Sequence, residues 1–464
     1  MTKTTITPLE RETGIRNYLR FVLFNGIGFN FIGETSVILL ALHFNASNLH
    51  IGFLNSCFNM TGVIALIAPI MLAGLRVIDV FYYVWIIRGF ICILYIATLL
   101  MSAPSAIMVI IIVFTLFNIM RTVGAAMIDT VHRSLVPAEE MGAFVSRFTT
   151  QWLISAVIAQ SASFIILSIP PLKGLYGLLL LQLIGTSLNT LGTRHIRKIP
   201  VEERVAPAKS FNMVRAFLTG IREVQTRTVL VLFACNLSLG IMLGFTIPLL
   251  KKTAHFATNT VFLYTIVMTL TSILSSNLLR SFTDRIGKKP VLILTSIAAF
   301  LAVLLWAFIP ASSPAPLFFL LGSATAFILT MYNQTVSVLI LRVIPSKEKT
   351  NFSFLIRFLS AIIALIAGFV SGIIADAGTH IAAGGFLHPF SLIFFVSAAL
   401  FIASAVIGIR LSEPGSLSVF ESAKILLTTV EMRYLFDFNV LKNKDKKPPR
   451  KDRSWTSKTP SVKE

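Results

Sequence analysis

The chain has 464 residues, of which 55% are hydrophobic and only 13% are charged. A soluble domain carries about 25% charged residues, so a soluble fold of this composition would lack the polar groups that must face water. The mean hydropathy of +0.82 agrees. These values exclude an ordinary soluble protein and indicate an integral membrane protein, in which lipid covers the apolar surface.

Twelve long apolar segments follow one another along the chain, and each approaches the roughly 20 residues that a membrane-spanning helix needs. Apolar and polar residues do not alternate within them, which excludes β-barrel strands. The first segment is too long for the core of a signal peptide. We therefore predict an all-α integral membrane protein with spans at 17–42, 49–73, 80–101, 106–131, 148–169, 173–193, 228–250, 260–280, 290–310, 316–341, 354–375 and 388–410.

Lys and Arg are concentrated in alternate loops, which accounts for the net charge of +20. The opposite set of loops contains only Lys251 and Lys252, with Lys173 at an edge. The positive-inside rule then predicts a multi-pass protein of a cell or inner membrane with both termini in the cytoplasm. The basic loops predict contact with anionic lipid and argue against nucleic-acid binding.

The two halves of the chain resemble each other. Pro137 and Pro345 follow spans 4 and 10 and are 345 − 137 = 208 residues apart, and Arg147 and Arg357 begin the next spans 357 − 147 = 210 residues apart. Spans 1 and 7 start 228 − 17 = 211 residues apart. Six spans per half give both halves the same orientation, a parallel repeat known from transporters. We predict six-helix bundles at 1–193 and 228–410, a cytoplasmic linker at 194–227 and a cytoplasmic tail at 411–464.

The tail divides into two predicted parts. Residues 416–436 have the pattern of an amphipathic helix at the membrane interface, with Ser418 and Glu421 as a capping box at its start. From Lys442 onward the tail is basic and predicted to be disordered and attracted to lipid.

Between spans 8 and 9 the sequence reads Asp284-Arg285-Ile286-Gly287-Lys288-Lys289-Pro290. Glycine permits backbone conformations that are closed to other residues. An aspartate in this position can meet a helix N-terminus or a basic partner, as a conformation-sensitive latch. The lysines can anchor the loop at an anionic membrane face.

This string resembles the cytoplasmic loop motif of the major facilitator superfamily, which is aspartate-arginine-any-glycine followed by two basic residues. The resemblance extends over residues 15–410. It implies two six-helix bundles around a central cavity lined by spans 1, 4, 7 and 10, with alternating access by rocking. It also implies that Asp284, Arg285, Gly287 and Lys288 take part in gating.

Polar side chains within the spans are candidates for the solute site, because a charge in hydrocarbon costs roughly 2.5–3.5 kcal/mol on insertion scales and generally faces the bundle interior. Glu34 is the deepest acid, and as a desolvated carboxyl it could carry a proton. We predict a cavity that suits a polar or zwitterionic organic solute. Its predicted lining is Glu34, Asn30, Asn118 and Arg121 from the first half and Asn236, Tyr332 and Asn333 from the second.

A structural role competes with this interpretation at the charged positions. Glu34 could form an ion pair with Arg88 or Arg121 that only stabilises the fold. Asp129 and Arg133 are one turn apart near the end of span 4, which favours an interfacial pair over a solute contact.

The leading functional prediction is a secondary active permease, driven by a solute gradient or coupled to a proton or sodium ion. No nucleotide-binding loop and no nucleophile with its base occur, so we expect no enzyme and no cofactor. The three cysteines lie in apolar runs away from histidines, so we expect no metal site. Two alternatives stay open: a non-transporting receptor or sensor, and a lipid flippase whose cavity opens sideways into the membrane.

Overall fold

The computed structural model describes residues 6–137, 140–205, 213–343, 349–382, 387–413 and 415–428. Within these residues the chain is helical and contains no strand, apart from one isolated β-bridge between Arg76 and Arg204. Twelve helical segments are long and apolar enough to cross a membrane. The predicted all-α membrane fold is therefore confirmed.

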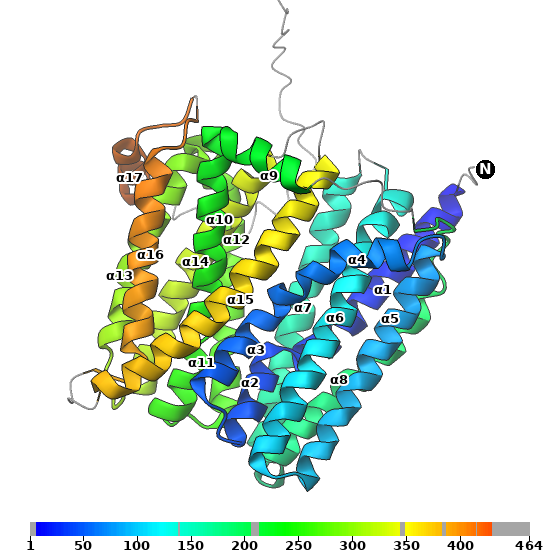
Figure 1. The fold of residues 1–464 in the computed structure, drawn as a ribbon, viewed down its shortest axis with the longest axis horizontal. Coiled ribbons are helices and arrows are strands. Elements are labelled where there is room, and N and C mark those ends of the chain that lie inside the picture. The colour runs from blue at the N-terminus through cyan, green and yellow to red at the C-terminus, as the bar shows by residue number, and fades with distance from the viewer. Residues whose placement is uncertain are drawn as a thin grey trace, which may run out of the picture. The chain divides into compact units, whose positions relative to one another are not determined.

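The first half contains spans 1 to 6. Helix α1 packs against α7 and α8, and α5 packs against α6 and α8. In Figure 1 the helices of this bundle are coloured from blue through cyan to blue-green. Its helices are α1 (Pro8–Ile32), α2 (Glu34–His43), α3 (Asn48–Met60), α4 (Ile64–Met71), α5 (Val77–Ile91), the 3₁₀ segment Cys92–Leu100, α6 (Ala103–Leu135), α7 (Met141–Ser168) and α8 (Leu175–Ile196).

The second half contains spans 7 to 12 and is preceded by the short helix α9 (Met213–Arg222). Helix α13 packs against α14 and α16, and α12 packs against α14. The helices of this bundle are α10 (Val224–Leu243), α11 (Thr246–Pro248), the π-helical turn Leu249–Thr253, α12 (Thr258–Ile286), α13 (Lys288–Phe308), α14 (Ala315–Val343), α15 (Lys349–Ala382) and α16 (Ser391–Ile409).

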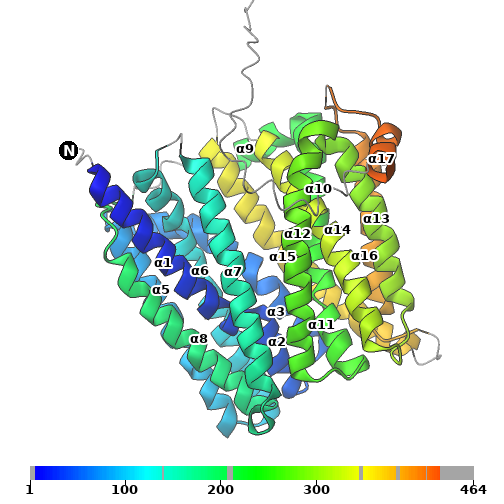
Figure 2. The ribbon, with the colours of Figure 1, turned by 180° about the vertical axis from the view of Figure 1, so that it is seen from behind.

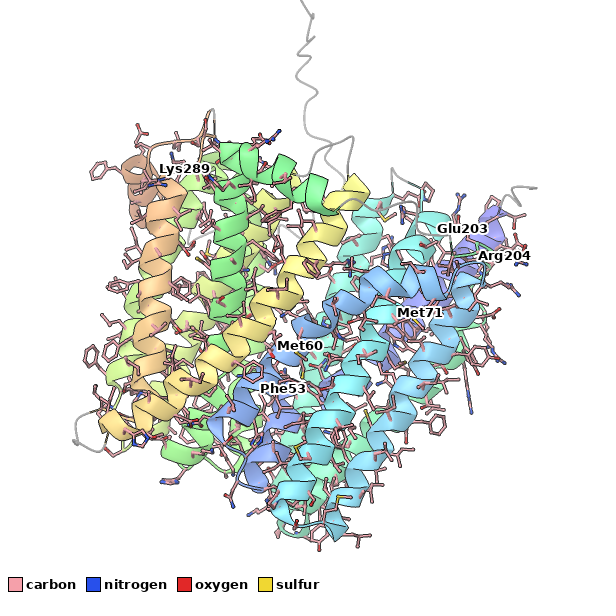
Figure 3. The ribbon with its side chains drawn as sticks, in the orientation of Figure 1. Phe53, Met60, Met71, Glu203, Arg204 and Lys289 are labelled. Carbon is pink, nitrogen blue, oxygen red and sulfur yellow. The ribbon has the colours of Figure 1, made fainter. Side chains whose placement is uncertain are left out.

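Two pairs of helices join the halves. Helix α3 packs against α15, and α7 packs against α12, as the opposite views in Figures 1 and 2 show. Small residues allow the first contact, because a Cβ added to Gly52 would meet the backbone carbonyl of Gly368. Phe53 packs on Phe369 beside this crossing, and Met60 extends the apolar contact along α3 (Figure 3). At the crossing of α3 and α15 the halves thus touch through glycine and apolar side chains.

Spans 1 and 7, expected to be continuous, are both interrupted. Helix α1 ends at Ile32, Gly33 adopts an extended conformation, and α2 starts at Glu34. Helix α10 ends at Leu243 and the chain continues through Gly244 into α11. The two glycines are 244 − 33 = 211 residues apart, which is the spacing of the repeat. Paired interruptions in equivalent spans of transporters mark the region of the binding site.

The chain that leaves each bundle returns to that bundle's loop between its second and third spans. In the first half the Val77 amide donates to the carbonyl of Glu203 (2.9 Å), and Glu203 and Arg204 lie beyond the end of α4 near Met71 (Figure 3). In the second half the amides of the equivalent loop donate to Glu413. The two glutamates are 413 − 203 = 210 residues apart, so the repeat extends past the sixth span.

The chain up to Leu417 forms one compact unit, and the helix α17 (Val419–Thr428) belongs to a second unit. At its start the Ser418 hydroxyl donates to the Glu421 carboxylate (2.7 Å), and the Glu421 amide donates back to that hydroxyl (3.2 Å). The predicted capping box is confirmed. The remainder of the predicted amphipathic helix and the basic end lie outside the described residues, and the predicted boundaries of the bundles and linker stay predictions.

Candidate functional site

A cavity of about 160 Å³ lies at the interruption of span 1. Its walls come from both halves, because span 1 and α7 belong to the first half and α12 belongs to the second. The lining residues are Phe29, Asn30, Gly33, Glu34 and Thr35 of span 1, Gln160 of α7, and Phe262 and Thr265 of α12.

Glu34 is the charged group of this cavity. It occupies the first position of α2, directly after the extended Gly33, so the local break in the helix turns its carboxylate into the cavity wall. Neutral oxygen-bearing side chains surround it. The Asn30 amide nitrogen donates to the Gly26 carbonyl (2.8 Å), which leaves its oxygen available, and the Gln160 oxygen accepts a bond from Thr269 across the two halves (3.0 Å).

A second predicted group forms around Arg121 on α6. Its Nε donates to the Asn118 side-chain oxygen (3.2 Å) and its Nη2 donates to the Phe58 carbonyl (2.6 Å). The guanidinium carbon lies 3.5 Å from the centre of the Phe58 ring, a cation–π contact. Asn118 is itself buried, and its amide donates to the Phe114 carbonyl (2.9 Å). The helical spacing of these residues on α6 thus fixes the arginine against α3.

Arg88 is 1% exposed and lies within the first half. Its Nη2 donates to the side-chain oxygens of Asn25 and Asn189, both at 2.5 Å. Its guanidinium also stacks on Trp85 and on Phe117 of α6. Among the described residues, neither Arg88 nor Arg121 forms an ion pair with Glu34, so the structural ion pair considered from the sequence does not occur in this conformation.

The predicted residues of the second half are not gathered around the first-half groups. Tyr332 is 0% exposed, and its hydroxyl donates to Ser404 of α16 (2.9 Å), so it lies inside the second bundle. Asn333 is exposed on α14, and Asn236 lies half-buried on α10. Their roles as solute ligands stay predictions. Tyr332 is buried against Phe401 and Ser404 of α16, contacts that helical spacing alone does not reveal.

Several residues of the two groups were not predicted from the sequence. Gln160, Phe262 and Thr265 complete the Glu34 cavity, and Phe58 supports Arg121. A polar residue in the middle of an apolar span was an available signal for Gln160. For the aromatic side chains no signal existed, because phenylalanine is common throughout the spans.

At one end of the spans the halves are joined by side-chain hydrogen bonds. Lys252 donates to the Ala46 carbonyl (2.8 Å), and Asn48 donates to Asp376 (2.9 Å). Further along the interface, Asn259 donates to Ser168 (3.0 Å). These contacts hold together the loops that the charge pattern predicts to face away from the cytoplasm.

The motif between spans 8 and 9 is held by the chain that follows span 12. Gly287 has φ = +100°, and a Cβ there would lie 2.7 Å from Ser416, so both conformation and space favour glycine. The amides of Lys288 and Lys289, the first residues of α13, donate to the Glu413 carboxylate, each at 2.7 Å. The side chains of Asp284 and Arg285 lie outside the described residues, so the predicted gating roles stay predictions.

Arg342 at the end of α14 also donates to Glu413, at 2.7 Å. Burial alone would raise the pKa of the Glu413 carboxyl, but the hydrogen bonds from Lys289, Arg342 and Lys288 and the charge of Arg342 lower its pKa below the ordinary value. Glu413 therefore joins three elements of the second half at the predicted cytoplasmic end: α13, α14 and the chain after α16.

Several transporters of known structure share this fold. The mutant form of the nucleoside transporter NupG aligns over 86% of this chain and 100% of its own, with 13% identity and a TM-score of 0.66. The inward-open xylose transporter XylE from E. coli covers 89% and 99%, with 13% identity and a TM-score of 0.64. A bacterial homologue of the lysosomal transporter Spinster covers 89% and 97%, with 14% identity and a TM-score of 0.60. These identities show a shared fold.

No curated protein matches the chain by sequence. The sequence profile of the Major Facilitator Superfamily matches residues 19–368, which is most of the chain. The match includes the interrupted span 1, the Glu34 cavity and the motif at 284–290. The resemblance inferred from that motif is confirmed, and the chain is a membrane transporter that belongs to the major facilitator superfamily.

Proposed function

We propose that this protein is a secondary active transporter that moves a small polar or zwitterionic solute by alternating access, with Glu34 as the group that binds a coupling proton or sodium ion. The observation that carries the proposal is a membrane-embedded carboxylate, without an ion pair among the described residues, in a cavity whose walls belong to both halves. A residue of this kind is costly in hydrocarbon and is a functional candidate by default.

The size of the cavity favours an ion over an organic solute. Pockets for drug-sized ligands measure about 300–1,000 Å³, whereas the Glu34 cavity measures about 160 Å³. A water molecule takes up about 30 Å³ of liquid, so the space suits a proton with water or a small cation. The polar side chains that line the cavity, which are Asn30, Glu34, Thr35, Gln160 and Thr265, each carry an oxygen atom. Oxygen atoms are the ligands that hard cations prefer.

The shared walls supply a way to couple the ion to movement. If the halves rock apart at the contacts of α7 with α12, Gln160 and Thr265 separate and the environment of Glu34 changes. Neutralisation of Glu34 by a cation then favours the arrangement in which the carboxylate is most buried. The hydrogen bonds at Lys252 and Asn48 support an arrangement closed on the side opposite the termini, which we propose is the outer side.

Gradient-driven uptake into proteoliposomes tests this function. Uridine, xylose and 5-aminolevulinic acid are suitable probes, because proteins of similar fold are described as a nucleoside transporter, a xylose transporter and a transporter in complex with 5-aminolevulinic acid. We expect an imposed proton or sodium gradient to accelerate uptake in the parent. Glu34→Gln should abolish that acceleration and retain exchange without a gradient.

Glu12→Gln is the matched control, because Glu12 is exposed on the same span and the chemical change is identical. A second measurement requires no solute. The distance between nitroxides attached through His43→Cys and His380→Cys, which are exposed at the joined ends of spans 1 and 11, should depend on pH or sodium in the parent and not in Glu34→Gln. If both variants respond like the parent in both assays, Glu34 does not couple the cycle.

A further inference from the structure

Arg121 has no acidic partner among the described residues. Its guanidinium donates to an amide oxygen and a backbone carbonyl and lies over the face of Phe58. Phe58 is 40% exposed, although Asn55, one turn earlier on α3, is buried and bonds to α10 of the second half. The ring that supports Arg121 is therefore partly uncovered, next to a point where α3 contacts the second half.

Other positive charges lie near Arg121. The Arg88 guanidinium lies 4.9 Å from the centre of the Phe117 ring, and Arg121 donates to Asn118, the next residue of α6. Arg357 belongs to the second half, at the start of the membrane-spanning part of α15. The backbone carbonyl of Arg357 lies 3.2 Å from the Cβ position of Gly62, which puts it against the same stretch of span 2 that carries Phe58. Two arginine side chains of the first half, and the backbone of a third arginine from the second half, thus lie along one stretch of spans 2 and 4.

This arrangement determines the sign of the ligand. Guanidinium groups in a low-dielectric region repel one another and lose their hydration, and hydrogen bonds to neutral oxygens recover only part of that loss. A cationic solute would add to the repulsion. A carboxylate or phosphate group has oxygen atoms that can accept two parallel, charge-assisted hydrogen bonds from the planar guanidinium group of an arginine.

We propose that the transported solute carries a carboxylate or phosphate group, which Arg121 binds with the support of Phe58. This inference rests on the proposed transport function and narrows its solute class. The Glu34 cavity then takes the cation, and the Arg121 region takes the anionic end of the solute. The two sites have opposite charge, so one substrate anion and one coupling cation could cross together without adding net charge.

Thermal unfolding of the purified full-length protein tests the inference without transport. The probes are pairs of similar size in which one member bears the anionic group: glucose 6-phosphate and glucose, succinate and succinamide, benzoate and benzamide, 5-aminolevulinic acid and its methyl ester. A ligand of the folded state raises the apparent melting temperature. We expect at least one anion to do so and its neutral partner not to.

Arg121→Gln should weaken the apparent affinity for that anion by about 10- to 100-fold, the effect of losing one charge-assisted hydrogen-bonding partner. Arg121→Lys keeps the charge without the fork, and should give an intermediate loss if the glutamine variant fails to fold. Arg76→Gln is the control, because Arg76 is half-exposed and pairs with Asp79 at the end of the bundle.

The inference is overturned if neutral members stabilise as well as anionic ones, if Arg121→Gln leaves the anion effect intact, or if none of the soluble anions binds. Stabilisation by phosphatidylglycerol alone would also overturn it, in favour of a lipid headgroup. Anion binding that Arg121→Gln weakens, without any flux of that anion, would refute transport and leave the anion site at Arg121 standing. Flux of a neutral sugar that Arg121→Gln does not affect would refute the inference and leave transport standing.

Discussion

Gly52→Ala should open the contact between the halves. The added Cβ would meet the Gly368 carbonyl oxygen and lie 3.1 Å from the Gly372 amide nitrogen. Both neighbours are backbone atoms of α15, so no side chain can turn away and the two helices must separate. Overpacking of this kind costs about 1–3 kcal/mol, whereas alanine gains about 0.5–1 kcal/mol over glycine within a helix. The helix preference acts equally whether the two helices are together or apart, so it does not enter the ratio of these two populations. An overpacking cost of about 1–2 kcal/mol, within this range, changes that ratio about 5- to 30-fold.

The assay is the distance between nitroxides introduced at the exposed His43 and His380, measured by double electron–electron resonance. We expect the longer-distance population to rise by that factor in Gly52→Ala. Gly240→Ala is the control, because nothing lies within 4 Å of its Cβ position on α10. The control should leave the distances unchanged and raise the melting temperature slightly. Equal behaviour of the two variants would refute the close approach of α3 and α15.

Three further predictions concern the ends of the bundles. Lys252→Met removes the bond to the Ala46 carbonyl, worth about 1 kcal/mol, and should shift the same nitroxide distances in the direction of Gly52→Ala; unchanged distances would contradict a latch at this end. A chain ending after Leu417 should melt like the parent, whereas one ending after Arg410 loses Glu413 and its bonds to α13 and α14 and should be less stable by about 1–3 kcal/mol; equal melting temperatures would exclude this role. The pKa of the Glu413 carboxyl is lowered in the folded protein. Its contribution to stability is therefore complete above the ordinary glutamate pKa of about 4.3 and is lost as the pH falls through the lowered value. Glu413→Gln should be less stable than the parent at neutral pH, and the difference in melting temperature should shrink in acid.

The two halves correspond at positions within the spans and at the ends of the bundles. Gly33 and Gly244 interrupt corresponding spans, and Glu203 and Glu413 receive the corresponding loops. The repeat therefore preserves both the interruption of the first span of each half and the hydrogen bonds of the loop between its second and third spans. The halves differ in the charged residues within their spans. The first half bears Glu34 and Arg121, whereas the second half contributes the neutral Thr265 to the Glu34 cavity.

Composition and pattern by themselves determined the membrane class, the twelve spans, the two similar halves and the family motif. These properties are local or periodic: each span needs only its own apolar residues, and the repeat needs only a constant spacing. The motif glycine was also recognisable, because its positive φ is a property of the loop in which it lies. Glu34 and Arg121 could be chosen as candidates because a charge within an apolar run is costly wherever the run packs.

The partners of those charges were decided by the tertiary structure alone. Glu34 shares its cavity with Gln160 and Thr265, which are more than 100 residues away in the sequence and lie on helices of different halves. Tyr332 contacts Phe401 and Ser404 of α16 within its own bundle. Side-chain direction on a buried helix depends on which neighbours cover each face, and an apolar span surrounded by lipid and protein has no polar face that would reveal this in advance.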